Sequence, residues 1–366
     1  MKNFQLDRFN NDLLIGLFAF NQASGYTVTK LKNRWQPTWE NNLALAKQAD
    51  DLGIDFLLPI ARWRGFGGET NPHGTNFEPF TWAAGLLAAT KKIFVFSTIH
   101  LPLINPVYAS KIMVTNDHIG NGRFGLNAVC GWNEFEFDMH GALFNGHEKR
   151  YKHGEEWMTV VERIWSEDIP FDFDDEFFQL KQVKLNPKPV NGNHPLIMNA
   201  GRSEQGQEFA INHADYIFLG HRDLASDFVT KDVAALRQRA TSLGRDKIGI
   251  CTNIFIVCKP TQKEAEEFYQ DFALTNADSE AINNIMVERG IDKLPEKFQE
   301  QFRNRAGAGH GAPNIVGDPE YVASELIRLH KLGINGFALG LFDYIEDLGY
   351  LSKTVLAELK NLGYRQ

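Results

Sequence analysis

The stretch that decides the fold runs from Gly122 to Gly141, GRFGLNAVCGWNEFEFDMHG. It opens on a glycine turn and continues as a short apolar run, Phe124 to Cys130, with the length of a buried strand. Asn127 lies within this run, and a buried amide without a hydrogen-bond partner costs about 1–3 kcal/mol. Trp132 lies just past it, where parallel-strand enzymes place their chemistry. On this stretch alone, an Asn paired with backbone and a Trp filling a core are equally good explanations.

Composition narrows the class of protein. The chain has 366 residues, enough for one large domain or two ordinary ones. A formal charge of -8 without a Lys/Arg run argues against a general nucleic-acid binder. Three cysteines without CxxC spacing favour a reducing compartment. No signal-peptide pattern and no apolar run of membrane-spanning length occur. We therefore expect a cytoplasmic protein that binds neither nucleic acid nor membrane.

Apolar runs of strand length alternate with helical patterns along the chain. The expected strands cover residues 13–20, 55–60, 93–101, 124–130, 195–201, 216–219, 249–258 and 336–341. This alternation predicts an α/β fold, a (β/α)8 TIM barrel, as a single domain over residues 1–366. Insertions are expected after the fourth and seventh strands, at about 167–190 and 261–312. The first suits a small hairpin, and the second is too long for a simple connection.

A barrel of this kind carries its site on the loops that follow the strands. After the second strand, Arg62 and Arg64 stand among three glycines. After the fifth, Ser203 begins a helix, where free N–H groups and the helix dipole can hold a phosphate. An ordinary N-cap explains Ser203 as well, and a surface ion pair and a core aromatic explain Arg150 and Tyr151. Together these residues describe one pocket with a phosphate end and a flat, amide-lined end.

The combination resembles the bacterial-luciferase-like superfamily of flavin monooxygenases. The likeness covers nearly the whole chain and is greatest to the group of pyrimidine, dimethylsulfone and dibenzothiophene-sulfone monooxygenases. Its most specific element is the stretch quoted above. It is supported by RGFGG at 64–68, RY at 150–151, AGRS at 200–203 and VGDPEYVASEL at 316–326.

The resemblance implies FMN as the cofactor and assigns residues to it. The implied cofactor contacts are Ala61, Arg62, Thr98, Asn127, Glu136, Arg150, Tyr151 and Ser203. The implied catalytic residues are Asn127 at the flavin N5 edge, Thr98 opposite it, and Trp132 as a wall of the oxygen or substrate pocket. Glu136 is expected in the loop after the fourth strand, and segment 261–312 as a lid. The chain departs from the pyrimidine enzyme at Ala61 and Arg62, and its substrate-side loops also differ, so the likeness bears more directly on the cofactor than on the substrate.

The implied activity is two-component oxygenation. A separate NAD(P)H:flavin reductase supplies reduced FMN, and O2 is used to oxygenate a small organic substrate with cleavage of a C–N or C–S bond. The substrate class is a pyrimidine or amide, or a sulfone. The chain has no GxGxxG after a strand, which fits an enzyme that does not bind NADH itself. A homo-oligomer, dimer or tetramer, is expected.

Three other interpretations remain open. The superfamily also contains deazaflavin (F420) enzymes that transfer hydride, and a non-catalytic flavin-binding protein is a further alternative. A metal-dependent hydrolase on the same barrel would need clustered His and Asp at strand ends. The histidines have no HxxxH or HExxH spacing, so no metal is expected. His310 is retained as a candidate lid contact.

Overall fold

The barrel expected from the alternating pattern is confirmed. The computed structural model describes residues 5–220, 224–245 and 247–366. In these parts of the chain, parallel strands pair in the order β11-β1-β2-β3-β4-β7-β8-β9, and β9 closes the ring by pairing with β11. The strands are β1 (Leu14–Phe18), β2 (Phe56–Leu58), β3 (Phe94–His100), β4 (Phe124–Val129), β7 (Leu196–Asn199), β8 (Tyr216–Phe218), β9 (Gly249–Cys258) and β11 (Gly336–Gly340).

Helices surround the barrel and fill its longer connections. The α-helices are α1 (Trp39–Asp51), α2 (Pro79–Ala89), α3 (Pro106–Ile119), α4 (Glu134–Met139), α5 (His147–Ser166), α6 (Glu204–His213), α7 (Ser226–Ser242), α8 (Gln262–Tyr269), α9 (Ser279–Glu288), α10 (Glu296–Ala306), α11 (Pro319–Lys331), α12 (Tyr344–Lys353) and α13 (Val355–Asn361). Several begin at a polar cap followed by proline, as Asn105 does for α3 by accepting the amides of Val107 and Tyr108. Among the described residues, no helix is both long enough and apolar enough to cross a membrane.

The interior of the barrel changes character along β3. Phe94 and Phe96 belong to the apolar cluster that fills the barrel. Because side chains alternate along a strand, Thr98 and His100 lie on this same face, nearer the carboxyl end. The inward-facing positions thus pass from phenylalanine to polar residues where the loops of the site begin.

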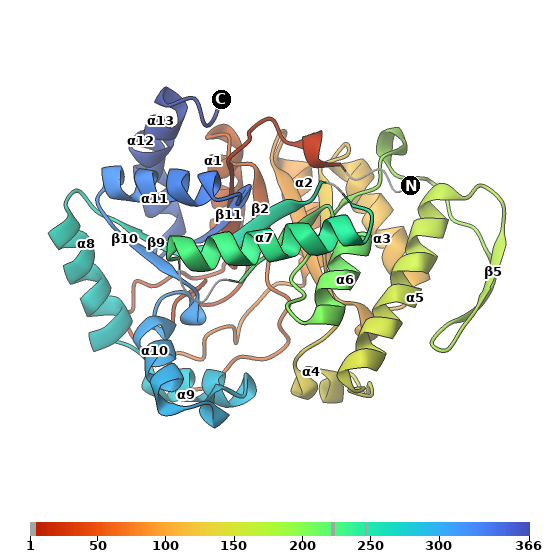
Figure 1. Ribbon diagram of the computed structural model, residues 1–366, viewed down its shortest axis with the longest axis horizontal. Coiled ribbons are helices and arrows are strands. Elements are labelled where there is room, and N and C mark those ends of the chain that lie inside the picture. The colour runs from red at the N-terminus through yellow and green to blue at the C-terminus, as the bar shows by residue number, and fades with distance from the viewer. Residues whose placement is uncertain (1–4, 221–223, 246) are drawn as a thin grey trace.

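Both expected insertions are present. After α5, β5 (Phe171–Asp174) and β6 (Gln179–Val183) form the antiparallel hairpin, which extends beyond α5 at the edge of the molecule (Figure 1). The segment 261–312 holds α8, α9 and α10, which is more helix than the sequence indicated, together with a π-helical turn (Gln270–Thr275). The remaining short 3₁₀ turns are Leu6–Arg8, Leu101–Leu103, Val190–Gly192, Ile291–Lys293 and Gly309–Gly311.

A strand after the second insertion and a short helix after β4 also differ from the sequence-based expectation. A further strand, β10 (Asn314–Gly317), pairs in parallel with the carboxyl half of β9, which is ten residues long and extends past its pairing with β11. The segment after β4 was expected to be a loop, and this was wrong. Asn133 accepts the amide of Phe135 and starts the short helix α4, which carries Glu136.

Candidate active site

Thr98 and Asn127 lie side by side at the carboxyl end of the barrel. They are register partners on β3 and β4. The Asn127 Nδ2 donates to Thr98 Oγ1 at 3.1 Å, and the Thr98 hydroxyl donates to the Pro59 carbonyl at 2.6 Å. Asn127 Oδ1 is buried without a hydrogen-bond partner among the described residues. The two side chains are therefore hydrogen-bonded neighbours, and their placement at the N5 edge of a flavin stays a prediction.

Arg62 and Glu136 form a buried ion pair close to this position. Arg62 Nε lies 3.2 Å from Glu136 Oε1, and their side chains are 1% and 0% exposed. The amide of Trp63 also donates to Glu136 Oε1 at 3.0 Å. Burial raises the pKa of Glu136, and the charge of Arg62 partly offsets this. The structure thus brings together two of the expected cofactor residues, one from the loop after β2 and one from the short helix α4.

His100 faces the free oxygen of Glu136. Its Nδ1 lies 3.6 Å from Glu136 Oε2, which is too long for a hydrogen bond. Burial lowers the pKa of His100 to about 4, and the nearby Arg62 acts in the same direction. The imidazole is therefore neutral near pH 7, with one donor and one acceptor nitrogen.

A cavity of about 650 Å³ opens at this end of the barrel. It is lined by Ala61, Thr98 and His100 and continues between α2 and α3. Trp132 is not among its lining residues and is 39% exposed. Its ring lies 5.2 Å from the Arg62 guanidinium. Ala61 and Thr98 are thus placed for a bound molecule, whereas the role of Trp132 as a wall stays a prediction.

The expected phosphate end is built around the start of α6. Ser203 is the N-cap, and its Oγ accepts the amide of Gly206 at 3.1 Å. The Tyr151 hydroxyl lies against this turn, because a Cβ on Gly206 would come within 2.6 Å of it. Arg150 donates to the carbonyls of Gly131 and Asn145. Ser203 and Tyr151 are therefore brought together, whereas the guanidinium of Arg150 donates to backbone carbonyls.

A second group of aromatic side chains at the barrel mouth was missed. The rings of His73 and His310 stack with centroids 4.4 Å apart, and Tyr26 stacks on His310 at 5.3 Å. Burial lowers the pKa of both histidines well below its usual value. The sequence points to His310 as a candidate lid contact, whereas His73 in the loop after β2 was not predicted. The sequence around His73, Pro72-His73-Gly74, contains no metal-binding or catalytic motif.

Several buried polar atoms near the mouth have no hydrogen-bond partner in the described residues. They are Asn127 Oδ1, Arg62 Nη1, Glu136 Oε2, His100 Nδ1 and both ring nitrogens of His73 and His310. Such atoms each cost about 1–3 kcal/mol unless something pairs with them. A flat ring with donors and acceptors along its edge, as in a flavin, supplies such partners. The residues present therefore fit a flavin at this end of the barrel.

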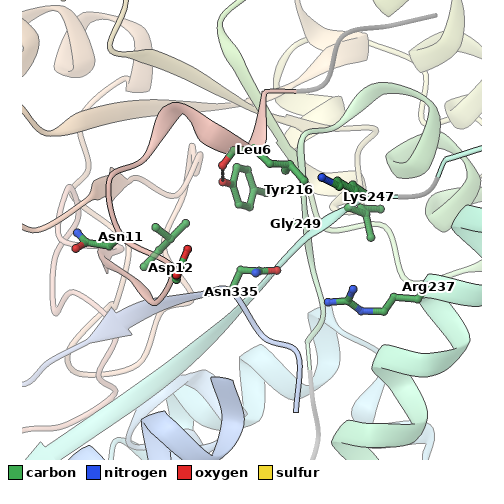
Figure 2. A pocket seen from close by; sticks show the side chains of 10 residues that line it. Leu6, Asn11, Asp12, Tyr216, Arg237, Lys247, Gly249 and Asn335 are labelled. Atoms are coloured by element: carbon green, nitrogen blue, oxygen red, sulfur yellow. Dashed lines mark hydrogen bonds between the residues drawn. The ribbon is translucent and has the colours of Figure 1, made fainter. Parts of the chain in front are cut away.

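A smaller cavity, of about 230 Å³, lies at the opposite end of the barrel. Figure 2 shows Tyr216, Gly249 and Asn335 around it, at or just before the starts of β8, β9 and β11. The Tyr216 hydroxyl there donates to the Leu6 carbonyl at 3.0 Å. The amino-terminal end of such a barrel usually serves stability rather than chemistry, so the candidate site is the larger cavity.

The described residues were also compared with the requirements of a metal site and of a reactive thiol. Within residues 5–220, 224–245 and 247–366, no group of three or more His, Cys, Asp or Glu side chains is arranged to hold a metal. Cys130 follows β4 in the stretch that decides the fold, but burial raises the pKa of its thiol. It is therefore a thiol packed in the core rather than a nucleophile.

Comparisons with known proteins assign the chain to a family. The family model described as luciferase-like monooxygenase matches residues 14–336. The chain thus belongs to the luciferase-like monooxygenase family.

Individual proteins similar to this chain have more specific names than the family. It is 30% identical over 346 residues to the pyrimidine monooxygenase RutA of Acinetobacter baylyi, covering 92% of each chain. It is 27% identical to an FMNH2-dependent dimethylsulfone monooxygenase of Pseudomonas putida, covering 93% of this chain and 94% of that one. The crystal structure of DmoA from Hyphomicrobium sulfonivorans superposes with a TM-score of 0.86 at 17% identity, covering 97% of this chain and 89% of that one. At that identity, the superposition shows the fold alone.

Proposed function

We propose that this monooxygenase uses reduced FMN and O2 to oxygenate a small organic substrate, with cleavage of a C–N or C–S bond. The observation that carries the proposal is the Thr98–Asn127 pair beside the large cavity, with Asn127 Oδ1 left unpaired inside the barrel. When bound, reduced FMN supplies the electrons that activate O2. The relatives named above support a pyrimidine or amide, or a sulfone, as the substrate class.

Different residues of the chain would bind the phosphate and the ring of the cofactor. Ser203 and Tyr151, with Arg150 on the same helix as Tyr151, would hold the phosphate at the start of α6. Asn127 and Thr98 would orient the ring edge. Ala61 and Arg62 would contact the ring from the loop after β2, and Glu136 from α4. Trp132 would close the pocket.

The proposal also includes a partner reductase, a cellular compartment, an oligomeric state and a lid. A separate NAD(P)H:flavin reductase supplies the reduced cofactor, and the enzyme works in the cytoplasm as a homodimer or homotetramer. The chain acts as one domain, with segment 261–312 as the lid that excludes water.

Anaerobic titration of the apoprotein with reduced FMN, FAD and reduced F420 tests the cofactor. We expect reduced FMN to bind more tightly than FAD, because the seat at Ser203 suits one terminal phosphate. Equal or tighter binding of F420 would move the enzyme to hydride transfer. Tight flavin binding without oxygen uptake in the presence of pyrimidines, sulfones and amides would indicate a flavin-binding protein without activity.

A further inference from the structure

The guanidinium of Arg62 is enclosed on almost every side. Nε lies 3.2 Å from Glu136 Oε1, and Nη2 lies 3.2 Å from Glu288 Oε2. Aromatic rings of Phe66 and Trp132 lie 4.3 Å and 5.2 Å from its carbon. Within the described part of the chain, Nη1 is the one nitrogen of this guanidinium without a hydrogen-bond partner, although it is buried. The planar fork of an arginine is fixed once two of its nitrogens are held.

Glu288 reaches this position from a distant part of the chain. It is the last residue of α9, inside the insertion that follows β9, and its side chain is 6% exposed. Besides Arg62, its carboxylate accepts from Asn133 Nδ2 at 2.9 Å and lies 3.6 Å from Arg64. In Figure 1, α9 and α4 lie on the same side of the barrel, as the contact with Asn133 requires. One carboxylate thus joins the insertion to the loop after β2 and to the cap of α4.

We propose that Glu288 is a positioning residue that makes Arg62 a single-donor site for a neutral acceptor oxygen. This rests on the proposed function. Nε donates to the Arg64 carbonyl beside the carboxylate of Glu136, and Nη2 donates to Glu288 and to the same carbonyl, so Nη1 is left to donate. Glu136 and Glu288 also offset part of the positive charge of Arg62, Arg64 and Arg289, so an anionic group placed at Nη1 would face two nearby groups of like charge. A carbonyl or sulfonyl oxygen fits instead, from the flavin ring or from the substrate.

Anchoring of the insertion does not depend on Glu288. The amide and hydroxyl of Thr70 both donate to Asp278 Oδ2 at 2.8 Å. Asn284 Nδ2 donates to the Phe66 carbonyl at 2.7 Å. These bonds already fix the start and middle of α9 against the loop after β2. The contacts of Glu288 with Arg62 and Asn133 therefore serve the site.

The test compares Glu288→Gln with two controls. Glu280→Gln removes the same charge from an exposed position on α9, and Thr70→Val weakens the Asp278 anchor. FMN affinity and the absorption spectrum of bound FMN form one arm. The KM and kcat for uracil and dimethylsulfone, assayed with a flavin reductase, form the other. If the oxygen belongs to flavin, Glu288→Gln weakens FMN about tenfold and shifts its spectrum. If it belongs to substrate, KM rises about tenfold while kcat and FMN affinity stay near wild type.

A third arm needs neither flavin nor turnover. With one carboxylate removed, the excess charge of Arg62 should recruit an anion, so sulfate should raise the Tm of Glu288→Gln by about 2 °C more than that of wild type or Glu280→Gln. The proposal is overturned if Glu288→Gln matches Glu280→Gln in all three arms. It is equally overturned if Glu288→Gln and Thr70→Val change in parallel. Absence of flavin binding by the wild type would contradict the proposed function, and the sulfate arm would still report on Glu288.

Discussion

The amide of Asn127 donates to the hydroxyl of Thr98 across neighbouring strands, and that hydroxyl donates to the carbonyl of Pro59. Because the hydroxyl proton is used on Pro59, the Thr98 oxygen is the acceptor in its bond with Asn127. This leaves Asn127 Oδ1 as an acceptor in the buried mouth of the barrel. The pair therefore offers a bound molecule one oriented acceptor.

The first prediction removes that acceptor. Asn127→Leu keeps the approximate volume and should leave the barrel folded, while turnover falls about 10²–10³-fold, as is typical when one preorganised polar group beside the reacting atoms is lost. FMN affinity should change much less than turnover. Oxygen uptake with reduced FMN and a flavin reductase measures the rate, and circular dichroism checks the fold. A variant that turns over near the wild-type rate would show that Asn127 is structural.

The second prediction concerns the phosphate end. Ser203→Ala should weaken FMN by about 1–2 kcal/mol, the scale of one hydrogen bond to a charged group. It should also destabilise the protein by about 1 kcal/mol, because Ser203 caps α6. Thr261→Ala is the matched control, since Thr261 caps α8 in the same manner, outside the residues assigned to the cofactor. Equal FMN affinity in both variants and the wild type would mean that Ser203 is only a cap.

The third prediction uses the stacked histidines. Burial lowers the pKa of His73 well below its value in the unfolded chain, so the unfolded chain takes up a proton first as the pH falls. Stability is therefore lost as the pH falls below about 6.5. His73→Phe should make this loss shallower by up to about 1.4 kcal/mol per pH unit. Urea unfolding between pH 7 and pH 5 measures the slope, and an unchanged slope would contradict the account.

The fourth prediction tests the seam that joins the end of the chain to the barrel. Arg365 and Asp55 form an ion pair at 2.5 Å, with side chains 2% and 5% exposed. Asp55 Oδ2 also accepts the amide of Ile15 at 2.7 Å. Arg365→Ala leaves a buried carboxylate without its cation and should lower the free energy of unfolding by about 3–5 kcal/mol. FMN affinity should be retained. A loss of less than about 1 kcal/mol would show that Asp55 is satisfied by its backbone contacts.

The barrel could be predicted from the sequence because its strands are short apolar runs bounded by turn residues and helix caps. Asn127 was recognisable for the opposite reason, as an amide inside such a run. Strand β10 could not be predicted, because its four residues, NIVG, are too few to show a periodic pattern. They form a strand because β9 extends beyond its pairing with β11. The short helix α4 was hidden in an acidic and aromatic stretch.

The contacts within the site could not be predicted from the sequence. Arg62 and Glu288 are 226 positions apart, and nothing in either neighbourhood marks the other as its partner. The stacking of His73 on His310 likewise depends on two loops meeting at the barrel mouth. The resemblance to a family pointed to Arg62 and Glu136, but the charge balance around them follows only from the folded chain.

The most direct test of the central claim is incorporation of ¹⁸O from ¹⁸O2, with reduced FMN supplied by a flavin reductase and with pyrimidines, sulfones and amides as substrates. The account predicts one labelled oxygen atom in the product of at least one of these substrates, and no product when O2 is left out. Product that forms without O2, or that carries oxygen only from water, would contradict it.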